Sequence, residues 1–337
     1  MMCAQRQPTV LWALVSTKVR ALMDVILHIG AHRTATTTFQ HYMRTHMDAL
    51  NTAKLTFWGP LRTRKGLFDG LGLESGRIGV EKRRARGVGR VQVQLERHHN
   101  IGVRHLVVSD ENMIGSVRDN LKRQRLYPGI GERVARYVQA FEGHLTRVVL
   151  SIRSLESFWA SSLAYGVPKG ARVPNASGLD RLVTQPRSWR DVITDLSCAL
   201  PDDVELLIAP FERLAGRPDD MLEYMVQGQL VAPRRDADSW RNKSPELTDL
   251  HEALRDRGEP CELLPQDSGV WHAFDRMQAA TLREIYADDL FWLRAGADGM
   301  ALLIEETGAE STGHNPFAGL INRGQYYDQE RGLVRTR

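Results

Sequence analysis

The sequence predicts an α/β fold whose central parallel sheet is covered by helices on both faces. Its candidate strands are short, continuous apolar runs, not alternating patterns, as expected for strands that are buried on both sides. Segments with helical spacing separate these runs, an order that favours parallel connections. The 337 residues, 42% of them apolar and 26% charged, are sufficient for one full hydrophobic core.

Five short segments are the candidate strands, and several longer segments have helical spacing. The apolar runs occupy residues 25–29, 55–60, 104–109, 147–152 and 204–208, the second of them a strand or a turn that stops at Gly-Pro. The helical patterns occupy residues 131–141, 189–200 and 219–226, and residues 242–305 are mostly helical with a break around 258–260. The predicted protein therefore has a mostly helical C-terminal portion.

The chain is predicted to form one α/β domain over residues 23–312. The preceding apolar stretch, 10–15, is too short for a membrane span and is not followed by a clear cleavage site. We therefore expect residues 1–22 to be a loose extension, with Met23 as the natural start. Residues 313–337 are rich in Gly and Asn, and we expect an irregular tail there.

Charge and cysteine content narrow the classes of partner. The formal net charge of +4 and the pI of about 9.0 suit anionic ligands, but the excess is too small to predict nucleic-acid binding. Cys3, Cys198 and Cys261 are far apart and odd in number, so they predict neither a disulfide framework nor a zinc site. We expect a cytoplasmic protein without membrane insertion, nucleic-acid partner or bound metal; the oligomeric state is not predicted.

The first strand leads into a candidate phosphate-binding loop. Gly30 ends the apolar run, small and hydroxylated residues follow over 34–38, and a helical pattern begins there. In such a strand–turn–helix unit, backbone N–H groups point at an anion. The nucleoside-triphosphate pattern G-x-x-x-x-G-K-[ST] does not fit, because it would place its second Gly at Ala35 and its Lys at Thr36. Arg33 is the one permanent cation of this turn.

Ligands of open α/β sheets bind beyond the carboxyl ends of the strands. Residues 30–38, 109–112 and 153–161 follow three candidate strands, so we expect them to line one crevice. A guanidinium such as Arg153 binds phosphate through two donors, and Ser161 adds a third from the next helix. The alternative for Arg153 is a surface ion pair with Glu156.

Glu111, directly after the second of these strands, is a candidate general base. A transfer to a hydroxyl needs a base within hydrogen-bond reach of the acceptor oxygen. Asp110 competes for that role. The structural alternative is a helix start, with Ser109 or Asp110 as the cap and Glu111 in the first turn; the two roles are compatible for neighbours.

These residues resemble the sulfotransferases that use 3′-phosphoadenosine 5′-phosphosulfate (PAPS), in particular a bacterial, glycan-sulfotransferase-like branch. Residues 30–37, GAHRTATT, are similar to the family loop G-x-x-K-[ST]-G-T-T, with Arg33 in place of Lys and Ala35 in place of Gly. Arg153 and Ser161 have the spacing of the family's 3′-phosphate ligands. Residues 109–111 resemble its S-x-E segment, and residues 242–244 resemble an N-x-S segment of that branch.

The resemblance implies a three-layer sheet of the P-loop nucleotide-hydrolase type that takes PAPS as sulfuryl donor without a metal ion. It assigns catalysis to Arg33, which stabilises the leaving oxygen, and to Glu111, the base. The cofactor-binding residues it implies are Gly30, His32, Arg33, Thr34, Ala35, Thr36, Thr37 and Thr38 for the 5′-phosphosulfate and Arg153, Ser161 and Arg323 for the 3′-phosphate.

The acceptor that this function implies is a hydroxyl or an amine, on a glycan or on a small molecule. The carboxylate base and the basic stretch 82–90 favour a glycan. One interpretation of that stretch is a lid or a patch that binds an anionic acceptor. The other is a solvated helix face or a mobile loop without a role in binding. A P-loop kinase-like phosphotransferase is an alternative on the same fold. A non-catalytic nucleotide-binding relative is another, motivated by Arg33 and Ala35.

Overall fold

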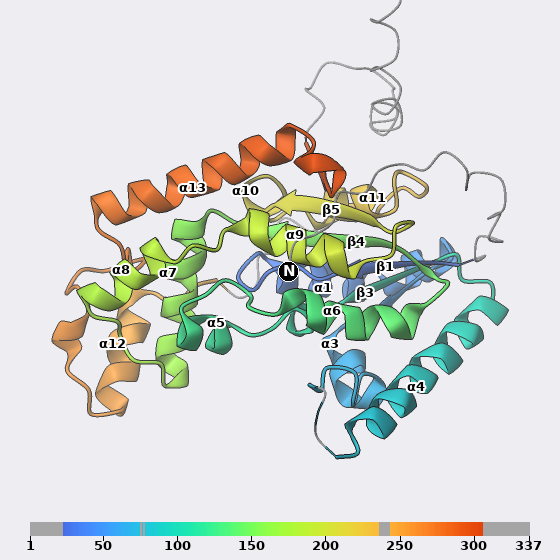
Figure 1. Cartoon of the computed structure of the whole chain (residues 1–337), viewed down its shortest axis with the longest axis horizontal. Helices are drawn as coiled ribbons and strands as arrows, with labels where there is room; N and C mark the ends of the chain where they lie inside the picture. Colours follow the sequence, from blue (N-terminus) through green and yellow to red (C-terminus); the bar gives the residue numbers. More distant parts are fainter. Residues whose placement is uncertain (1–22, 75, 77, 236–242, 306–337) are drawn as a thin grey trace, which may run out of the picture.

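The computed structural model describes residues 23–74, 76, 78–235 and 243–305 (Figure 1). Its centre is a six-stranded sheet in the order β2-β3-β1-β4-β5-β6, and every pair of neighbours is parallel. The strands are β1 (Asp24–His28), β2 (Leu55–Trp58), β3 (His105–Ser109), β4 (Leu145–Ile152), β5 (Glu205–Pro210) and β6 (Leu302–Leu303). The parallel sheet confirms the predicted α/β class.

Helices occupy most of the chain between the strands. The α-helices are α1 (Thr36–Thr45), α2 (Met47–Thr52), α3 (Pro60–Arg62), α4 (Val80–Asn100), α5 (Val117–Arg123), α6 (Ile130–Val138), α7 (Leu155–Gly166), α8 (Ala176–Thr184), α9 (Trp189–Ala199), α10 (Phe211–Leu214), α11 (Pro218–Met225), α12 (Leu247–Asp256) and α13 (Arg276–Arg294). Shorter turns are η1 (Thr63–Leu67), η2 (Glu111–Met113), η3 (Gln139–Phe141), η4 (Val167–Lys169), η5 (Cys261–Leu263) and η6 (Ala297–Gly299).

Neighbouring residues of each central strand pack against different helices. Ile26, Val107 and Val149 belong to an apolar cluster with residues of α1, α2 and α11. Leu27 and Val108 belong to a larger cluster with residues of α4, α6, α7, α9 and α13. The sheet is thus buried on both faces, which explains why its strands read as continuous apolar runs.

The C-terminal portion differs in detail from the mostly helical pattern predicted for it. Helix α12 ends just before Gly258, whose φ of 67° stops a helix, as the expected break requires. Residues 264–275 are not helical, and β6 was not predicted. A two-residue strand at the sheet edge is too short to show any periodicity, and its hydrogen bonds to β5 define it.

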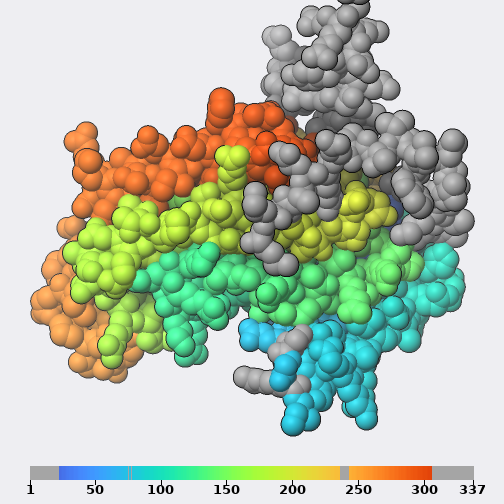
Figure 2. Space-filling view, in the orientation of Figure 1, coloured from blue at the N-terminus to red at the C-terminus, as the bar shows by residue number. Residues whose placement is uncertain are grey.

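The basic stretch 82–90 lies on the exposed surface of α4, where Lys82, Arg83 and Arg86 face solvent. In Figures 1 and 2 this helix projects at the lower right, away from α7 and α8 at the left.

Among the helices that the structure describes, none has an apolar stretch long enough to cross a membrane. Residues 1–22 and 313–337, with Arg323, lie outside the described residues, as does Asn242.

Candidate functional site

The carboxyl ends of β1, β3 and β4 open into one cavity of about 280 Å³. The residues lining it are His32, Arg33, Ala35, Thr36, Thr37, Glu111, Val117, Arg153, Tyr165, Phe211, Lys243, Ser244, Glu246 and Val270. All three segments expected to share a crevice contribute to this lining. The parallel sheet brings them together because successive strands end at the same edge.

The turn after β1 has little space and an unusual backbone. A Cβ atom at Gly30 would lie 2.9 Å from Thr36 Oγ1 and 3.1 Å from His28 Nε2, so only glycine fits there. Arg33 and Ala35 adopt left-handed conformations, with φ of 67° and 62°. Such a conformation costs a residue with a Cβ atom about 1–2 kcal/mol. The Gly that the family loop has at position 35 would avoid that cost.

Several donors of this turn have no partner among the described residues. The amides of Arg33, Thr34 and Ala35 form no hydrogen bond there. Thr36 Oγ1, which is buried, has no partner there either. A buried polar group is almost always hydrogen-bonded in a folded protein, so Thr36 Oγ1 and the amides beside it indicate a ligand position.

Three of the predicted loop residues do not face the cavity. Gly30, Thr34 and Thr38 are absent from its lining, and both threonines are buried. The hydroxyl of Thr34 donates to Ala31 O at 2.5 Å, so it closes the turn. His32, Ala35, Thr36 and Thr37 are the loop residues that line the cavity, together with Arg33.

His32 is fixed by Tyr127, a residue for which no role was predicted. Tyr127 Oη accepts from the His32 amide at 2.8 Å and lies 2.9 Å from Nδ1. Since Nε2 lies 3.3 Å from Asn112 Oδ1, the consistent tautomer carries its proton on Nε2. Burial lowers the pKa of His32, although the charge of Glu111 opposes the shift. The imidazole is therefore neutral near pH 7.

Arg33 and Arg153 form a cationic wall with Ser161 and Ser244. Arg33 Nε donates to Ser161 Oγ at 2.9 Å and Nη2 donates to Ser244 Oγ at 3.2 Å, while the two hydroxyls are 2.6 Å apart. The guanidinium also lies over the ring of Tyr165, 5.1 Å from its centroid. The side chain of Arg33 thus reaches the predicted 3′-phosphate ligand Ser161.

Arg153 joins this wall from the start of α7. Its Nη1 donates to Arg33 O at 3.0 Å, and its guanidinium lies 4.2 Å from the centre of the Phe211 ring. Its Nε is buried without a partner among the described residues. The alternative of a surface pair with Glu156 is not found, because Glu156 accepts from Arg283 at 3.1 Å.

The two arginines of the cationic wall are half-buried beside each other, and the described residues provide no matching anion. Within the described ranges neither forms an ion pair with a carboxylate. Burial and the charge of Arg153 lower the pKa of Arg33, and burial lowers that of Arg153 against the opposing charge of Glu212. Like charges so placed are stabilised by a bound anion.

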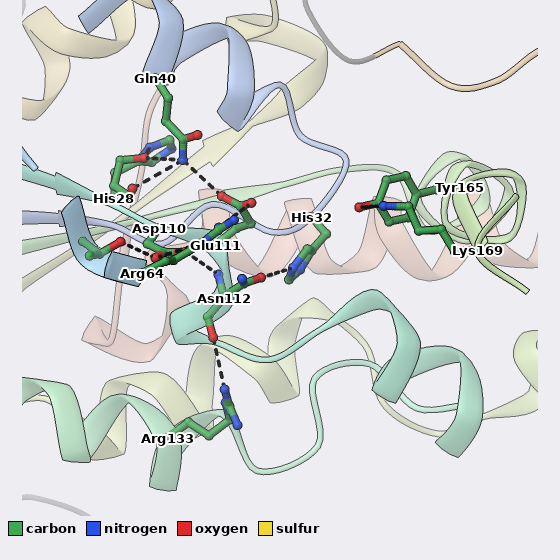
Figure 3. Close-up of polar contacts among 12 residues, drawn as sticks. His28, His32, Gln40, Arg64, Asp110, Glu111, Asn112, Arg133, Tyr165 and Lys169 are labelled. Atoms are coloured by element: carbon green, nitrogen blue, oxygen red, sulfur yellow. Dashed lines mark hydrogen bonds and ion pairs between the residues drawn. The ribbon is translucent and has the colours of Figure 1, made fainter. Parts of the chain in front are cut away.

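Glu111 lies in a carboxylate wall that it forms with Asp110, Arg64 and Gln40 (Figure 3). Arg64 Nη2 donates to Glu111 Oε1 at 2.9 Å, and Gln40 Nε2 donates to Oε2 at 3.1 Å. Burial would raise the pKa of Glu111, but the hydrogen bond from Arg64, a backbone hydrogen bond and the charge of Arg64 hold it below its ordinary value. Glu111 is therefore ionised near neutral pH and can accept a proton.

Asp110 is the structural member of this wall. It receives hydrogen bonds from Thr63 Oγ1 at 2.5 Å and Arg64 Nη2 at 2.6 Å, and it caps η2 by accepting from Asn112 N at 3.1 Å. Glu111 is the first residue of that turn. The helix-start interpretation and the base interpretation are thus both compatible with the geometry, with Asp110 as the cap.

Four residues that the sequence analysis did not assign complete the two walls: Gln40, Arg64, Tyr165 and Phe211. Gln40 follows Thr36 by four residues on α1, so helical spacing could have placed both on one face. Arg64 follows the end of β2 closely, which is the edge where ligands bind. Phe211, directly after β5, contributes its ring to the cavity.

Comparison of the chain with protein-family models, with curated proteins and with solved structures found no match. The described residues contain no group of three or more His, Cys, Asp and Glu side chains with the geometry of a metal site. The function must therefore be argued from the chemistry of the cavity.

Proposed function

We propose that this protein is a sulfotransferase that moves a sulfuryl group from PAPS to a hydroxyl or amine acceptor. The observation that carries the proposal is the cationic wall, with two half-buried arginines that have no carboxylate partner among the described residues, beside a turn whose amides have no partner there either. A ligand with two separate anionic groups, such as a 3′,5′-bisphosphorylated adenosine, suits two such groups of donors.

The turn after β1 and Arg153 provide donors for both phosphates of this ligand. Thr36 Oγ1 and the amides of residues 33–35 are free to bind a 5′-phosphate, and Arg153 Nε is free to bind a second one. Glycine at position 30 leaves the turn close enough to β4 for its amides to converge. The sheet order and the anion loop after β1 support a P-loop type of three-layer fold, which we include in the proposal.

Bound PAPS supplies the sulfuryl group and a bisphosphate leaving group. Glu111 takes the proton of the acceptor hydroxyl as the new oxygen–sulfur bond forms and the bond from sulfur to the bridging phosphate oxygen breaks. Arg33 stabilises the negative charge that develops on that oxygen, and Arg153 with Ser161 holds the 3′-phosphate. Catalysis of this kind depends mainly on positioning and charge stabilisation.

Arg33 raises one specific requirement. Its guanidinium donates to Ser161 and Ser244, so it must exchange these bonds for the leaving phosphate during turnover. An arginine can offset charge as the family's lysine does, but its high pKa makes it a poor proton donor. The proposal therefore gives Arg33 an electrostatic role only.

The kinase-like alternative is less well supported by the geometry. A kinase-like enzyme needs a carboxylate that holds Mg²⁺, and the oxygens of Asp110, which directly follows β3, are bonded to Thr63, Arg64 and the Asn112 amide. The non-catalytic alternative has the strained Arg33 and Ala35 in its favour. A sulfuryl-transfer assay distinguishes this alternative from the proposed enzyme, because a non-catalytic protein binds the nucleotide without turnover.

We retain the prediction of a cytoplasmic location, which the few scattered cysteines support.

Calorimetric titration with adenosine 3′,5′-bisphosphate in EDTA, with ATP as the control ligand, tests this proposal. We expect the bisphosphate to bind in the micromolar range and ATP to bind much more weakly, because only the former places a phosphate at both groups of donors. No binding of the bisphosphate, together with ATP binding that requires Mg²⁺, would replace the proposal with the kinase-like alternative.

A further inference from the structure

A second and larger cavity, of about 960 Å³, adjoins the nucleotide cavity. Helices α5, α7 and α8, turn η4 and the loop that follows it form this cavity. No aspartate or glutamate is among its described lining residues. Five of these residues are basic: Arg118, Lys122, Lys169, Arg172 and Arg181. We call it the basic groove. Its charge indicates an anionic ligand.

The basic groove is continuous with the nucleotide cavity through Val117 and Tyr165, which line both. The ring of Tyr165 is contacted by Arg33 of the cationic wall at 5.1 Å and by Lys169 of the groove at 3.8 Å. Figure 3 shows Tyr165 and Lys169 on the side of His32 that faces away from Gln40. A ligand in the groove can therefore extend toward Glu111.

The charges of the basic groove are available and partly held in place. Within the described part of the chain none of its five cations pairs with a carboxylate. Arg181 is oriented across the groove by bonds to Gln124 Oε1 at 2.8 Å and Ser177 Oγ at 2.7 Å. Arg257 donates to two carbonyl groups of segment 167–171, which fixes the wall of the groove near Lys169.

We propose that the basic groove binds the acceptor, and that the acceptor is an acidic oligosaccharide bearing carboxylate groups. This inference rests on the proposed sulfotransferase function, since such a molecule supplies both the hydroxyls that receive sulfate and the anions that the five cations bind. Leu121, Leu163 and Leu182 give the groove an apolar surface on which sugar rings can pack.

Single-stranded nucleic acid fits the basic groove less well. Binding of unpaired bases depends on exposed aromatic rings, each stacking on one base. Tyr165 is the one aromatic residue among the described lining side chains, and its ring is already in contact with Arg33 and Lys169. The groove thus provides charge and apolar surface without a stacking platform.

The basic groove also differs from the basic stretch 82–90, which was the acceptor candidate in the sequence. That stretch lies on α4, to the right in Figure 1, whereas α7 and α8 lie to the left. Arg84 of α4 is paired with Glu81 at 2.9 Å. Helix α4 therefore offers a control surface of similar charge that is remote from the site.

Titration of the full-length protein with tetragalacturonic acid, and with neutral maltotetraose as the control ligand, tests the inference. We expect the acidic sugar to bind and the neutral sugar to bind at least about tenfold more weakly, because only the former carries carboxylates. The variant Arg118→Gln/Arg172→Gln should weaken binding of the acid by about tenfold. The matched variant Lys82→Gln/Arg86→Gln should change it less than about twofold.

Equal binding of the two sugars, or equal loss in both variants, would overturn the inference. Tighter binding of tetraglutamate or of oligo-dT than of tetragalacturonate would overturn its assignment to a saccharide. Adenosine 3′,5′-bisphosphate is titrated into the same preparations. If the wild-type protein does not bind this nucleotide, the proposed function fails; if it binds the nucleotide but not the acidic sugar, only the inference about the groove fails. Thermal unfolding of each variant verifies that it is folded.

Discussion

The two walls of the nucleotide cavity differ in how their charges are matched. In the carboxylate wall, Asp110 and Glu111 share Arg64, and Gln40 donates to the remaining Glu111 oxygen. In the cationic wall, the partners that Arg33 and Arg153 have among the described residues are hydroxyls, carbonyls and aromatic rings. The charges of the carboxylate wall are thus matched by Arg64, whereas the described residues provide no anion for the cationic wall. In the proposed function, the anionic donor therefore binds at the cationic wall and the proton is transferred at the carboxylate wall.

Removing the base should have the largest effect. Glu111→Gln keeps the size of the side chain but cannot accept the acceptor proton, so turnover should fall by about 10²–10⁴-fold. Binding of adenosine 3′,5′-bisphosphate should persist, since that ligand belongs to the cationic wall. The measurement is steady-state sulfuryl transfer to an acceptor found by screening, with calorimetry in parallel.

Glu246→Gln is the matched control, because Glu246 lines the same cavity without belonging to the carboxylate wall. It should retain turnover within a few-fold of the wild-type rate. Equal losses in the two variants would mean that general negative potential, and not a base at Glu111, supports the reaction.

Removing the cation of the turn should have the next largest effect. Arg33→Met should lower turnover by about 10²–10³-fold, because charge developing on the leaving oxygen loses its preorganised partner. Arg33→Lys, which restores the residue of the family loop, should recover most of the rate. The same transfer assay measures both variants. A lysine variant as slow as the methionine variant would show that Arg33 acts through its bonds to Ser161 and Ser244.

Arg64 connects the two carboxylates, so its removal should change a pH profile. In Arg64→Gln no cation offsets the effect of burial on Glu111, so the pKa of Glu111 should rise. The acid limb of kcat/KM against pH should then move to higher pH. In the wild-type protein the lowered pKa also stabilises the fold above the ordinary pKa of a glutamate, and this contribution is lost as the pH falls through the pKa of the folded state. An unchanged acid limb would assign it to another group.

The strained backbone of the turn should give the smallest effect. Ala35→Gly removes the Cβ that disfavours a φ of 62°, and should raise the free energy of unfolding by about 0.5–1 kcal/mol after the entropy that glycine adds to the unfolded chain. Chemical denaturation measures this difference. Ala53→Gly, at a φ of −78°, is the control and should destabilise the protein instead.

The sequence predicted the parts of the molecule that depend on local patterns. Apolar runs located five of the six strands, and the rule that ligands bind at strand ends placed Glu111 and Arg153 at one cavity. Gly30 marked the tight turn. These features are readable because each is set by a few adjacent residues.

The contacts that complete the walls could not be predicted in the same way. Arg33 meets Ser244 across 211 residues, and Arg64 meets Asp110 across 46, so neither pair leaves a local pattern. The cations of the basic groove are scattered between positions 118 and 181 and form no charge run. The one evident charge run, at 82–90, instead lies on the exposed face of α4.

In the proposed function, the cationic wall binds the 3′-phosphate of a bisphosphorylated adenosine. The most direct test of this binding is calorimetry of adenosine 3′,5′-bisphosphate and adenosine 5′-monophosphate with the wild-type protein, Arg153→Ala and the surface control Arg283→Ala. We predict a preference of about 10–100-fold for the bisphosphate in the wild-type and control proteins, and its disappearance in Arg153→Ala, since one charge-assisted hydrogen-bond partner is lost. Equal affinity for both nucleotides in the wild-type protein, or a preference that survives in Arg153→Ala, would contradict the account.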